Sequence, residues 1–258
     1  ECDSDHDKGK FILTGSTSLS KEEREEEIFH SGTGRIAIMK MNPMSLYESG
    51  DSTGDVSIEE MFSGNVNCKY IRKVELDELA KLIIRGGWPE NIDKEGDDIE
   101  VIPRSYIESV ITRDINERKD KKRDSNKMRM LIRSLSRNET TIAGNDTIVK
   151  DIEEFENTDD LIASRLTVAD YVSVLDDLYL TANQEAFSIN YRSSKRIGKS
   201  PKRHLVDPSL ACASLDLTVD KLLNDHETFG LLFEALVERD LRIYMDYLDG
   251  HLYHFRDN

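Results

Sequence analysis

Residues 127–191 read KMRMLIRSLSRNETTIAGNDTIVKDIEEFENTDDLIASRLTVADYVSVLDDLYLTANQEAFSINY, and this stretch decides the fold class that the sequence predicts. In Lys127–Arg137 the apolar residues recur at spacings of three and four, the period of an amphipathic helix. Ile148–Phe155 and Thr167–Leu180 predict two more helices, and Phe187–Tyr191 predicts a strand. Three helices followed by a strand is the order of a winged helix-turn-helix. This order alone does not distinguish a DNA-binding module from a packing domain.

The C-terminal side of this stretch mixes short strands and helices. Arg203–Val206 predicts a strand, and Ser209–Leu215 and Thr218–Leu223 predict short helices. Glu227–Arg239 has a strong apolar face and predicts a longer helix. Leu252–Phe255 predicts a final strand.

The N-terminal side begins with a strand–helix–strand pattern. Residues 11–15 (FILTG) and 35–39 (RIAIM) are apolar runs bounded by turn residues, typical of strands buried on both faces of a parallel sheet. Between them Ser20–His30 predicts a helix, in which Ser20 and Glu23 form a capping box. The spacing predicts a βαβ unit.

A helical region with a Gly-Gly pair follows. Val74–Ile84 places its apolar residues on one face, and Ser105–Arg118 predicts the next helix. Arg85–Glu90 lies between them and reads RGGWPE, in which the glycines permit unusual backbone angles and Pro89 fixes the exit. We expect a hinge here, with Trp88 packed into the core.

Composition narrows the class of protein. The chain has 258 residues, a net charge of −16 and three cysteines, namely Cys2, Cys68 and Cys212. They form no CxxC pair, so neither a disulfide framework nor a zinc ribbon is predicted, and a reducing cytoplasm fits best. No apolar run approaches the roughly 18–20 residues of a membrane span. We therefore expect no membrane partner.

Positive charge gathers in two islands. Arg118–Arg137 carries a net +7 and Arg192–Arg203 a net +6, which leaves −29 for the rest of the chain. We interpret the first island as the solvated face of an amphipathic helix. The second has no apolar period and is the better candidate for binding an anion. Its nucleic-acid candidates are Arg192, Lys195, Arg196 and Lys199.

Six stretches, taken in order, resemble the prokaryotic AAA-type P-loop ATPases that carry a winged helix and a C-terminal nuclease-like domain. The stretches are FILTGS (11–16), GRIAIMKMNP (34–43), RGGWPE (85–90), YIESVITRDI (106–115), KSPKRHLVDPSL (199–210) and FGLLFEALVERDL (229–241). The resemblance implies an α/β plus α fold in four parts. These are the C-terminal part of the ATPase core (1–65), a helical lid (66–126), the winged helix (127–192), and the start of a restriction-endonuclease-like α/β domain (193–258).

The resemblance also implies ATP and Mg²⁺ as cofactors of the parent protein. The loop GxxxxGK[ST] that would bind them is not in this sequence, because Gly15–Ser18 and Gly32–Arg35 contain no Gly-Lys-Ser/Thr. We therefore expect the chain to be an internal fragment that is itself inactive as an ATPase. The carboxylate and lysine strands of the nuclease-like domain would likewise lie beyond Asn258.

The candidate catalytic residues follow from the resemblance. Thr14 and Ser16 correspond to a sensor strand that orients the attacking water, although the two residues alternatively cap a turn. Arg35 would stabilise phosphoryl charge in cis or from a neighbouring subunit of a homo-oligomer, and its alternative is a strand-edge arginine that reaches solvent. Arg113 of the RDI motif would do the same, with a structural helix ion pair as its alternative.

Asp207 and Glu234 are the carboxylates of the nuclease-like part. Hydrolysis of a phosphodiester needs carboxylates that converge on Mg²⁺, and with the partner strand missing a structural role is the stronger expectation. His251 and His254 face opposite sides of a strand, so no metal site is predicted. Two functions stay open: part of an ATPase, or a non-catalytic module that binds nucleic acid or a protein.

Overall fold

The computed structural model of the chain describes residues 12, 14, 39–65, 73–114, 123–156, 165–187 and 200–255. The chain divides into two compact units, Glu1–Met39 and Lys40–Asn258, and the second is the one described below. Ile12, Thr14 and Met39 are exposed and lie in no helix or strand, so the predicted buried strands are not found at these positions. The rest of the predicted βαβ unit lies outside the described residues.

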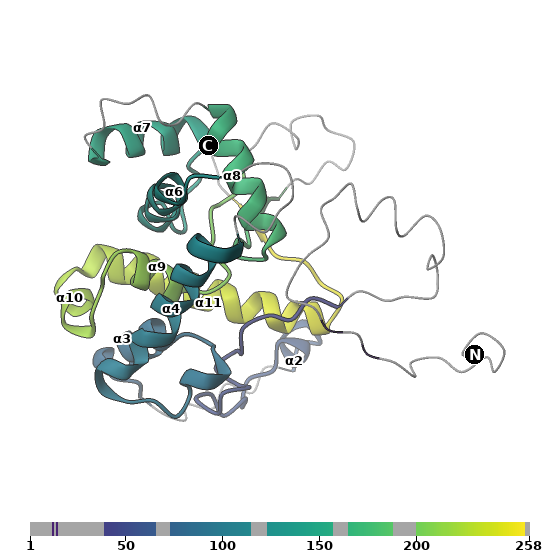
Figure 1. The fold of residues 1–258 in the computed structure, drawn as a ribbon. Coiled ribbons are helices and arrows are strands. Elements are labelled where there is room, and N and C mark those ends of the chain that lie inside the picture. The colour runs from purple at the N-terminus through teal and green to yellow at the C-terminus, as the bar shows by residue number, and fades with distance from the viewer. Residues whose placement is uncertain are drawn as a thin grey trace, which may run out of the picture. The chain divides into compact units, whose positions relative to one another are not determined.

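The second unit is mostly helical (Figure 1). Its helices of five residues or more, apart from the 3₁₀ and π turns, are α2 (Ile58–Phe62), α3 (Leu76–Arg85), α4 (Val101–Ser109), α6 (Ser125–Arg137), α7 (Asn145–Glu156), α8 (Arg165–Asp177), α9 (Pro208–Ser214), α10 (Val219–Asn224) and α11 (His226–Tyr247). Strands β1 (Glu185–Ala186) and β2 (Tyr253–His254) pair in parallel. The 3₁₀ turns Pro89–Asn91 and Gly96–Glu100 and a π-helical turn, Val110–Asp114, complete the description.

The apolar periods predicted most of these helices correctly. In α3, Ala80, Ile83 and Ile84 face the core, and the helix ends at Gly86, whose φ of +68° is left-handed. The predicted helix Ser105–Arg118 differs, because α4 begins at Val101 and passes into the π-helical turn at Val110.

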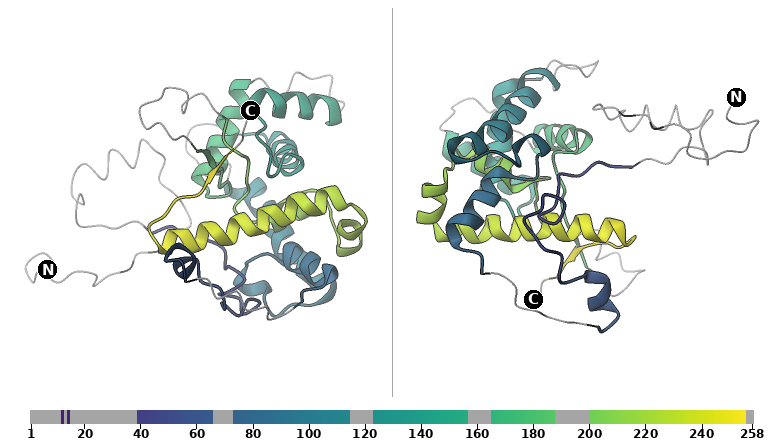
Figure 2. Two further views of the ribbon diagram at one scale, coloured as in Figure 1. Left: turned by 180° about the vertical axis from the view of Figure 1, so that it is seen from behind. Right: turned by 90° about the horizontal axis from the view of Figure 1, so that it is seen from below.

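Short helix α9 lies at the centre of the unit and contacts α3, α4, α6 and α11. Its buried residues include Leu210, Ala211 and Cys212, which join the core built by the longer helices. Figure 2 shows α11 as the long yellow helix, and it contacts α3, α9 and α10. Residues on α9 and α11 are therefore placed to connect segments that are far apart in the sequence.

The segment after α8 is an antiparallel hairpin. The Ala182 amide donates to the His204 carbonyl at 2.8 Å, and the Gln184 amide donates to the Lys202 carbonyl at 2.9 Å. Three helices are thus followed by two paired segments, Thr181–Gln184 and Lys202–Leu205. Of the predicted strand Phe187–Tyr191, Phe187 lies in no strand and the other residues lie outside the described part of the chain. Residues 188–199, which join the two strands, lie outside the described residues.

Candidate functional site

Asp207 is the centre of a buried polar junction at the start of α9. It caps the helix by accepting a hydrogen bond from the Ser209 amide at 2.9 Å, and Pro208 occupies the first turn. Its other oxygen accepts from the Gly87 amide at 2.9 Å and from Arg239 Nη1 at 2.8 Å. Because the side chain is fully buried, its charge depends on these donors.

Arg239 supplies the positive charge of this junction. Its guanidinium lies between two carboxylates, with Nη1 on Asp207 and with Nε and Nη2 on Asp240 at 2.9 and 2.7 Å. Burial by itself would raise the pKa of Asp207, but Arg239 and the donors at Ser209 and Gly87 outweigh it and hold the pKa below its usual value. The two carboxylates likewise raise the pKa of Arg239 against the effect of burial.

The two glycines of RGGWPE permit this close packing. A Cβ on Gly86 would lie 2.4 Å from Ser209 Oγ, and one on Gly87 would lie 2.1 Å from the Met44 carbonyl oxygen. The Gly87 carbonyl also accepts a hydrogen bond from the Met44 amide at 2.8 Å. Both glycines are therefore in close contact with neighbouring segments in this conformation, and the hinge stays a prediction.

Trp88 extends the junction towards α4. Its Nε1 donates to Ser209 Oγ at 2.8 Å, and its ring lies against Tyr106 with a centroid distance of 4.7 Å. Trp88 is partly buried and packs against the core, which confirms its predicted role.

Residues 44–51 form hydrogen bonds and an ion pair with the same group of polar residues. The Leu46 amide donates to Asp240 Oδ2 at 2.9 Å, and Arg85 forms an ion pair with Asp51 at 2.5 Å. Burial would raise the pKa of Asp51, and hydrogen bonds from Arg85 and Ser49 lower it below the usual value. We call this connected set the junction: Asp51, Arg85, Gly86, Gly87, Trp88, Asp207, Ser209, Arg239 and Asp240.

The sequence analysis did not identify most of the junction. Arg239 and Asp240 are charged residues on the buried face of an otherwise apolar helix, and that interruption of the period was the available signal. The Asp-Pro-Ser sequence at 207–209 was a second signal, because it is typical of a helix start.

The structure describes only some of the other predicted site residues. Thr14 is exposed, and Ser16 and Arg35 lie outside the described residues, as do the four nucleic-acid candidates between 192 and 199. Arg113 lies in the π-helical turn Val110–Asp114. Asp207 is buried in the junction, whereas Glu234 is exposed on α11 and pairs with Lys202. The two nuclease-like carboxylates thus have different surroundings.

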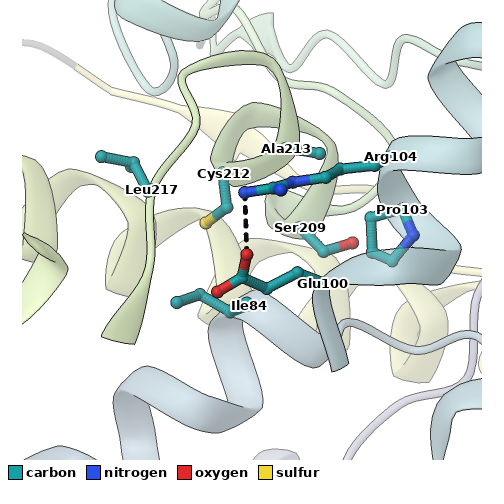
Figure 3. A pocket seen from close by; sticks show the side chains of 8 residues that line it. All are labelled: Ile84, Glu100, Pro103, Arg104, Ser209, Cys212, Ala213 and Leu217. Atoms are coloured by element: carbon teal, nitrogen blue, oxygen red, sulfur yellow. Dashed lines mark ion pairs between the residues drawn. The ribbon is translucent and has the colours of Figure 1, made fainter. Parts of the chain in front are cut away.

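A small hollow lies beside the junction (Figure 3). It encloses about 150 Å³ of empty space, open solvent included, and an ion pair of 2.7 Å between Arg104 and Glu100 lies across it. Burial raises the pKa of the Cys212 thiol strongly, so the reactive thiolate is disfavoured. The lining residues are Ile84, Glu100, Pro103, Arg104, Ser209, Cys212, Ala213 and Leu217.

Among the residues that the structure describes, no three His, Cys, Asp or Glu side chains are grouped so that they could hold a metal ion. Within the same residues, no helix is both long and apolar enough to cross a membrane.

The fold and the junction together define a helical domain closed around a buried ion network. Residues 76–221 match a domain family of unknown function, DUF8612, and the chain belongs to this family. The matched region runs from the first residue of α3 into α10 and contains both glycines, Asp207 and Ser209. No curated protein and no solved structure matches the chain.

Proposed function

We propose that this chain is the non-catalytic effector part of an AAA-type P-loop ATPase, whose ATP and Mg²⁺ bind to a loop encoded upstream of Glu1. In this proposal the described body transmits the nucleotide-driven movement to the domains that follow. Its cysteine content and its resemblance to the ATPases favour the cytoplasm.

One observation carries this proposal: four of the six ATPase-like stretches meet at the junction. Gly87 comes from RGGWPE, Tyr106 from YIESVITRDI, Asp207 from KSPKRHLVDPSL and Arg239 from FGLLFEALVERDL. Gly87 and Arg239 both donate to Asp207, and Tyr106 contacts Trp88, the residue after Gly87. Stretches that are far apart in the sequence thus resemble one family: three of them share one buried network, and the fourth contacts it through Trp88.

The network favours transmission over chemistry. Asp207 and Arg239 are 0% and 1% exposed, so a substrate could reach them only after the domain opened. Separating the pair would leave buried charges without partners, which costs about 3–5 kcal/mol. The segments that carry Gly87 and Asp207 are therefore expected to move together with α11.

The first test concerns nucleotide. Calorimetry of the chain with MgATP is expected to show no binding, because a triphosphate needs the backbone cradle and lysine of the missing loop. Sequencing the gene upstream of residue 1 is expected to reveal GxxxxGK[ST]. Micromolar affinity in the chain itself, or an upstream sequence without the loop, would contradict the proposal.

The second test concerns transmission, in the longer gene product. Arg239→Met is expected to leave nucleotide binding intact while the movement of the C-terminal domain, followed by fluorescence energy transfer, no longer depends on ATP. Arg129→Met is the matched control, since Arg129 forms an exposed pair with Glu108. An equal loss of movement in both variants would argue against the junction.

A second candidate function is contact with a nucleic-acid backbone. It is favoured by the hairpin, because the strands that pair through Gln184 and Lys202 carry the basic stretch 192–199 between them, after the third helix. Helix α8 contains one basic residue, Arg165, and three acidic ones, so contact would depend on this stretch. Replacing its four basic candidates with Ala should weaken DNA binding equally for all sequences and flatten the salt dependence. If the wild-type chain binds no DNA at low salt and the variant only melts earlier, the stretch serves internal contacts or a protein partner.

A further inference from the structure

A second buried cluster of ionisable groups lies apart from the residues of the junction. Glu139 follows the C-terminus of α6, His204 lies on the second strand of the hairpin, and Glu238 lies on α11. These side chains are 3%, 1% and 8% exposed. The cluster therefore lies where α6, the hairpin and α11 meet.

The imidazole lies between the two carboxylates. His204 Nδ1 is 3.2 Å from Glu139 Oε1 and 3.9 Å from Glu238 Oε2. Although Nδ1 is within ion-pair distance of Glu139, neither ring nitrogen makes a well-aligned hydrogen bond to a described residue. The contact is thus a close approach within ion-pair distance and not an aligned hydrogen bond.

The two carboxylates are neutralised differently. Glu238 forms an ion pair with Arg242 at 2.8 Å, and Arg242 also donates to the Val206 carbonyl at 3.0 Å. Glu139 accepts the Leu205 amide at 3.1 and 3.3 Å, and among the described residues its ion-pair partner is His204. Unlike Glu238, Glu139 therefore has no arginine or lysine as its ion-pair partner among the described residues.

We propose that Glu139 and His204 form a proton-operated latch, in which a proton on Glu139 lets the second strand of the hairpin pack against α6 and α11. When that proton leaves, Glu139 and Glu238 are two buried anions in one cluster, with Arg242 paired to Glu238 and not to Glu139, and the strand loosens at Leu205. The latch comprises Glu139, His204, Glu238 and Arg242.

The surroundings of the latch both raise and lower the pKa of Glu139. Burial is the first cause that raises the pKa of Glu139, the charge of Glu238 adds to it, and His204 and the Leu205 amide oppose it. The further charged or titratable groups on the elements packed here include Lys40, Asp176, Lys202, Arg203, Asp207, Cys212, Glu234, Arg239 and Asp240, and, nearer the ends of α6 and α11, Lys127, Arg129, Arg133, Arg137, His226, Glu227, Tyr244, Asp246 and Tyr247.

The sign of the pH dependence follows from linkage. A carboxyl group whose folded pKa lies above its unfolded value stabilises the fold below the unfolded pKa, and this contribution disappears as the pH rises through the folded pKa. For Glu139, the pH range over which this stabilisation is lost begins at the ordinary glutamate pKa of 4.5 and extends upward. Within it the unfolding equilibrium constant rises by up to about tenfold per pH unit.

The test compares the whole chain with Glu139→Gln, which mimics the protonated carboxyl group. Urea unfolding is measured from pH 4 to pH 8, and the ratio of the two unfolding constants is plotted, so that groups common to both proteins cancel. The ratio of wild-type to variant constants is expected to rise with pH. Glu234→Gln removes an exposed glutamate on α11, the helix that carries Glu238, and should give a flat ratio. A flat ratio for Glu139→Gln as well would overturn the proposal.

A measurement on the wild-type chain keeps the proposal testable if the variant does not fold. Carbon-13 NMR follows the carboxyl carbon of Glu139 through the same pH range, and hydrogen exchange follows the Leu205 amide. We expect Glu139 to titrate above 4.5 and the protection of Leu205 to fall over the same interval. Titration at or below the ordinary value, with constant protection, would contradict the latch.

Discussion

The junction and the latch both bury carboxylates against α11, but these carboxylates face different kinds of side chain. In the junction, Arg239 binds Asp207 and Asp240, and a guanidinium keeps its charge at every pH the protein meets. In the latch, Glu139 faces the imidazole of His204 and not a guanidinium, and burial raises the pKa of Glu139. Two sites of similar burial therefore have different tasks: the first fixes the fold, and the second responds to protons.

The comparison also shows that a buried charged residue can belong to either of two kinds of network, one permanent and one titratable. A charged residue on an apolar helix face indicates a polar network, but the sequence does not say which partner it meets. Arg239 meets a residue 32 positions away, and His204 meets one 65 positions away. The partner decides whether the network is permanent or titratable.

The largest effect is expected for Arg239→Met, which breaks the junction. It leaves Asp207 and Asp240 buried without their cation, and we expect the free energy of unfolding to fall by about 3–5 kcal/mol. Urea unfolding at neutral pH measures the loss. Arg129→Met, in an exposed pair with Glu108, should cost no more than about 1 kcal/mol. Similar losses in the two variants would show that the junction is solvated.

A loss of about 1–3 kcal/mol is expected for Gly87→Ala, because the new Cβ would lie 2.1 Å from the Met44 carbonyl oxygen. Thermal unfolding is the measurement. Gly230→Ala is the control: this glycine lies inside α11 with open space around it, so alanine should stabilise the helix by roughly 0.5–1 kcal/mol. If Gly87→Ala is tolerated without loss, RGGWPE does have the freedom of a hinge.

The sequence predicted the helices better than it predicted the sites. Helices α3, α6 and α11 were found because an amphipathic period is a local signal, which survives without knowledge of the rest of the chain. The junction was largely missed, since Gly87, Asp207 and Arg239 acquire their roles only when distant segments meet. RGGWPE shows the difficulty directly. In the sequence alone, Gly-Gly indicates a flexible backbone. In the structure the same glycines allow Met44 and Ser209 to approach the backbone closely.

The hairpin shows the same limit at the level of topology. Strands were predicted at Phe187–Tyr191 and Arg203–Val206, but the observed pairing is set by Ala182 with His204 and Gln184 with Lys202. Short strands carry little periodic signal, and their register depends on the partner strand. For this reason His204 could not be placed beside Glu139 from the sequence.

An intermediate effect is expected when the two sites are compared across pH in one experiment. Hydrogen exchange follows two amides, Gly87 bound to Asp207 and Leu205 bound to Glu139. Asp207 has a lowered pKa, so its contribution is present above the ordinary value of 3.8 and is lost only as the pH falls through its folded pKa. Glu139 has a raised pKa, so its contribution is lost as the pH rises above 4.5.

From pH 5 to pH 8 we therefore expect the opening free energy at Gly87 to stay constant and that at Leu205 to fall, by at most about 1.4 kcal/mol per pH unit. Protection factors corrected for intrinsic exchange give both values from the same sample. Parallel changes at the two amides would mean that the whole domain responds as one unit, and the contrast between the sites would be lost.

The smallest effect is expected at the edge of the junction, for Trp88→Phe. Phenylalanine keeps an aromatic ring against Tyr106 but removes the 2.8 Å hydrogen bond from Nε1 to Ser209, so the free energy of unfolding should fall by about 1 kcal/mol. Ser209→Ala removes the same bond from the other side and leaves the indole N–H without its acceptor. In a double-mutant cycle the two changes should therefore not add, and the coupling energy should be at least about 0.5 kcal/mol. Additive losses would show that Trp88 acts through packing alone, and that the polar network ends at Ser209.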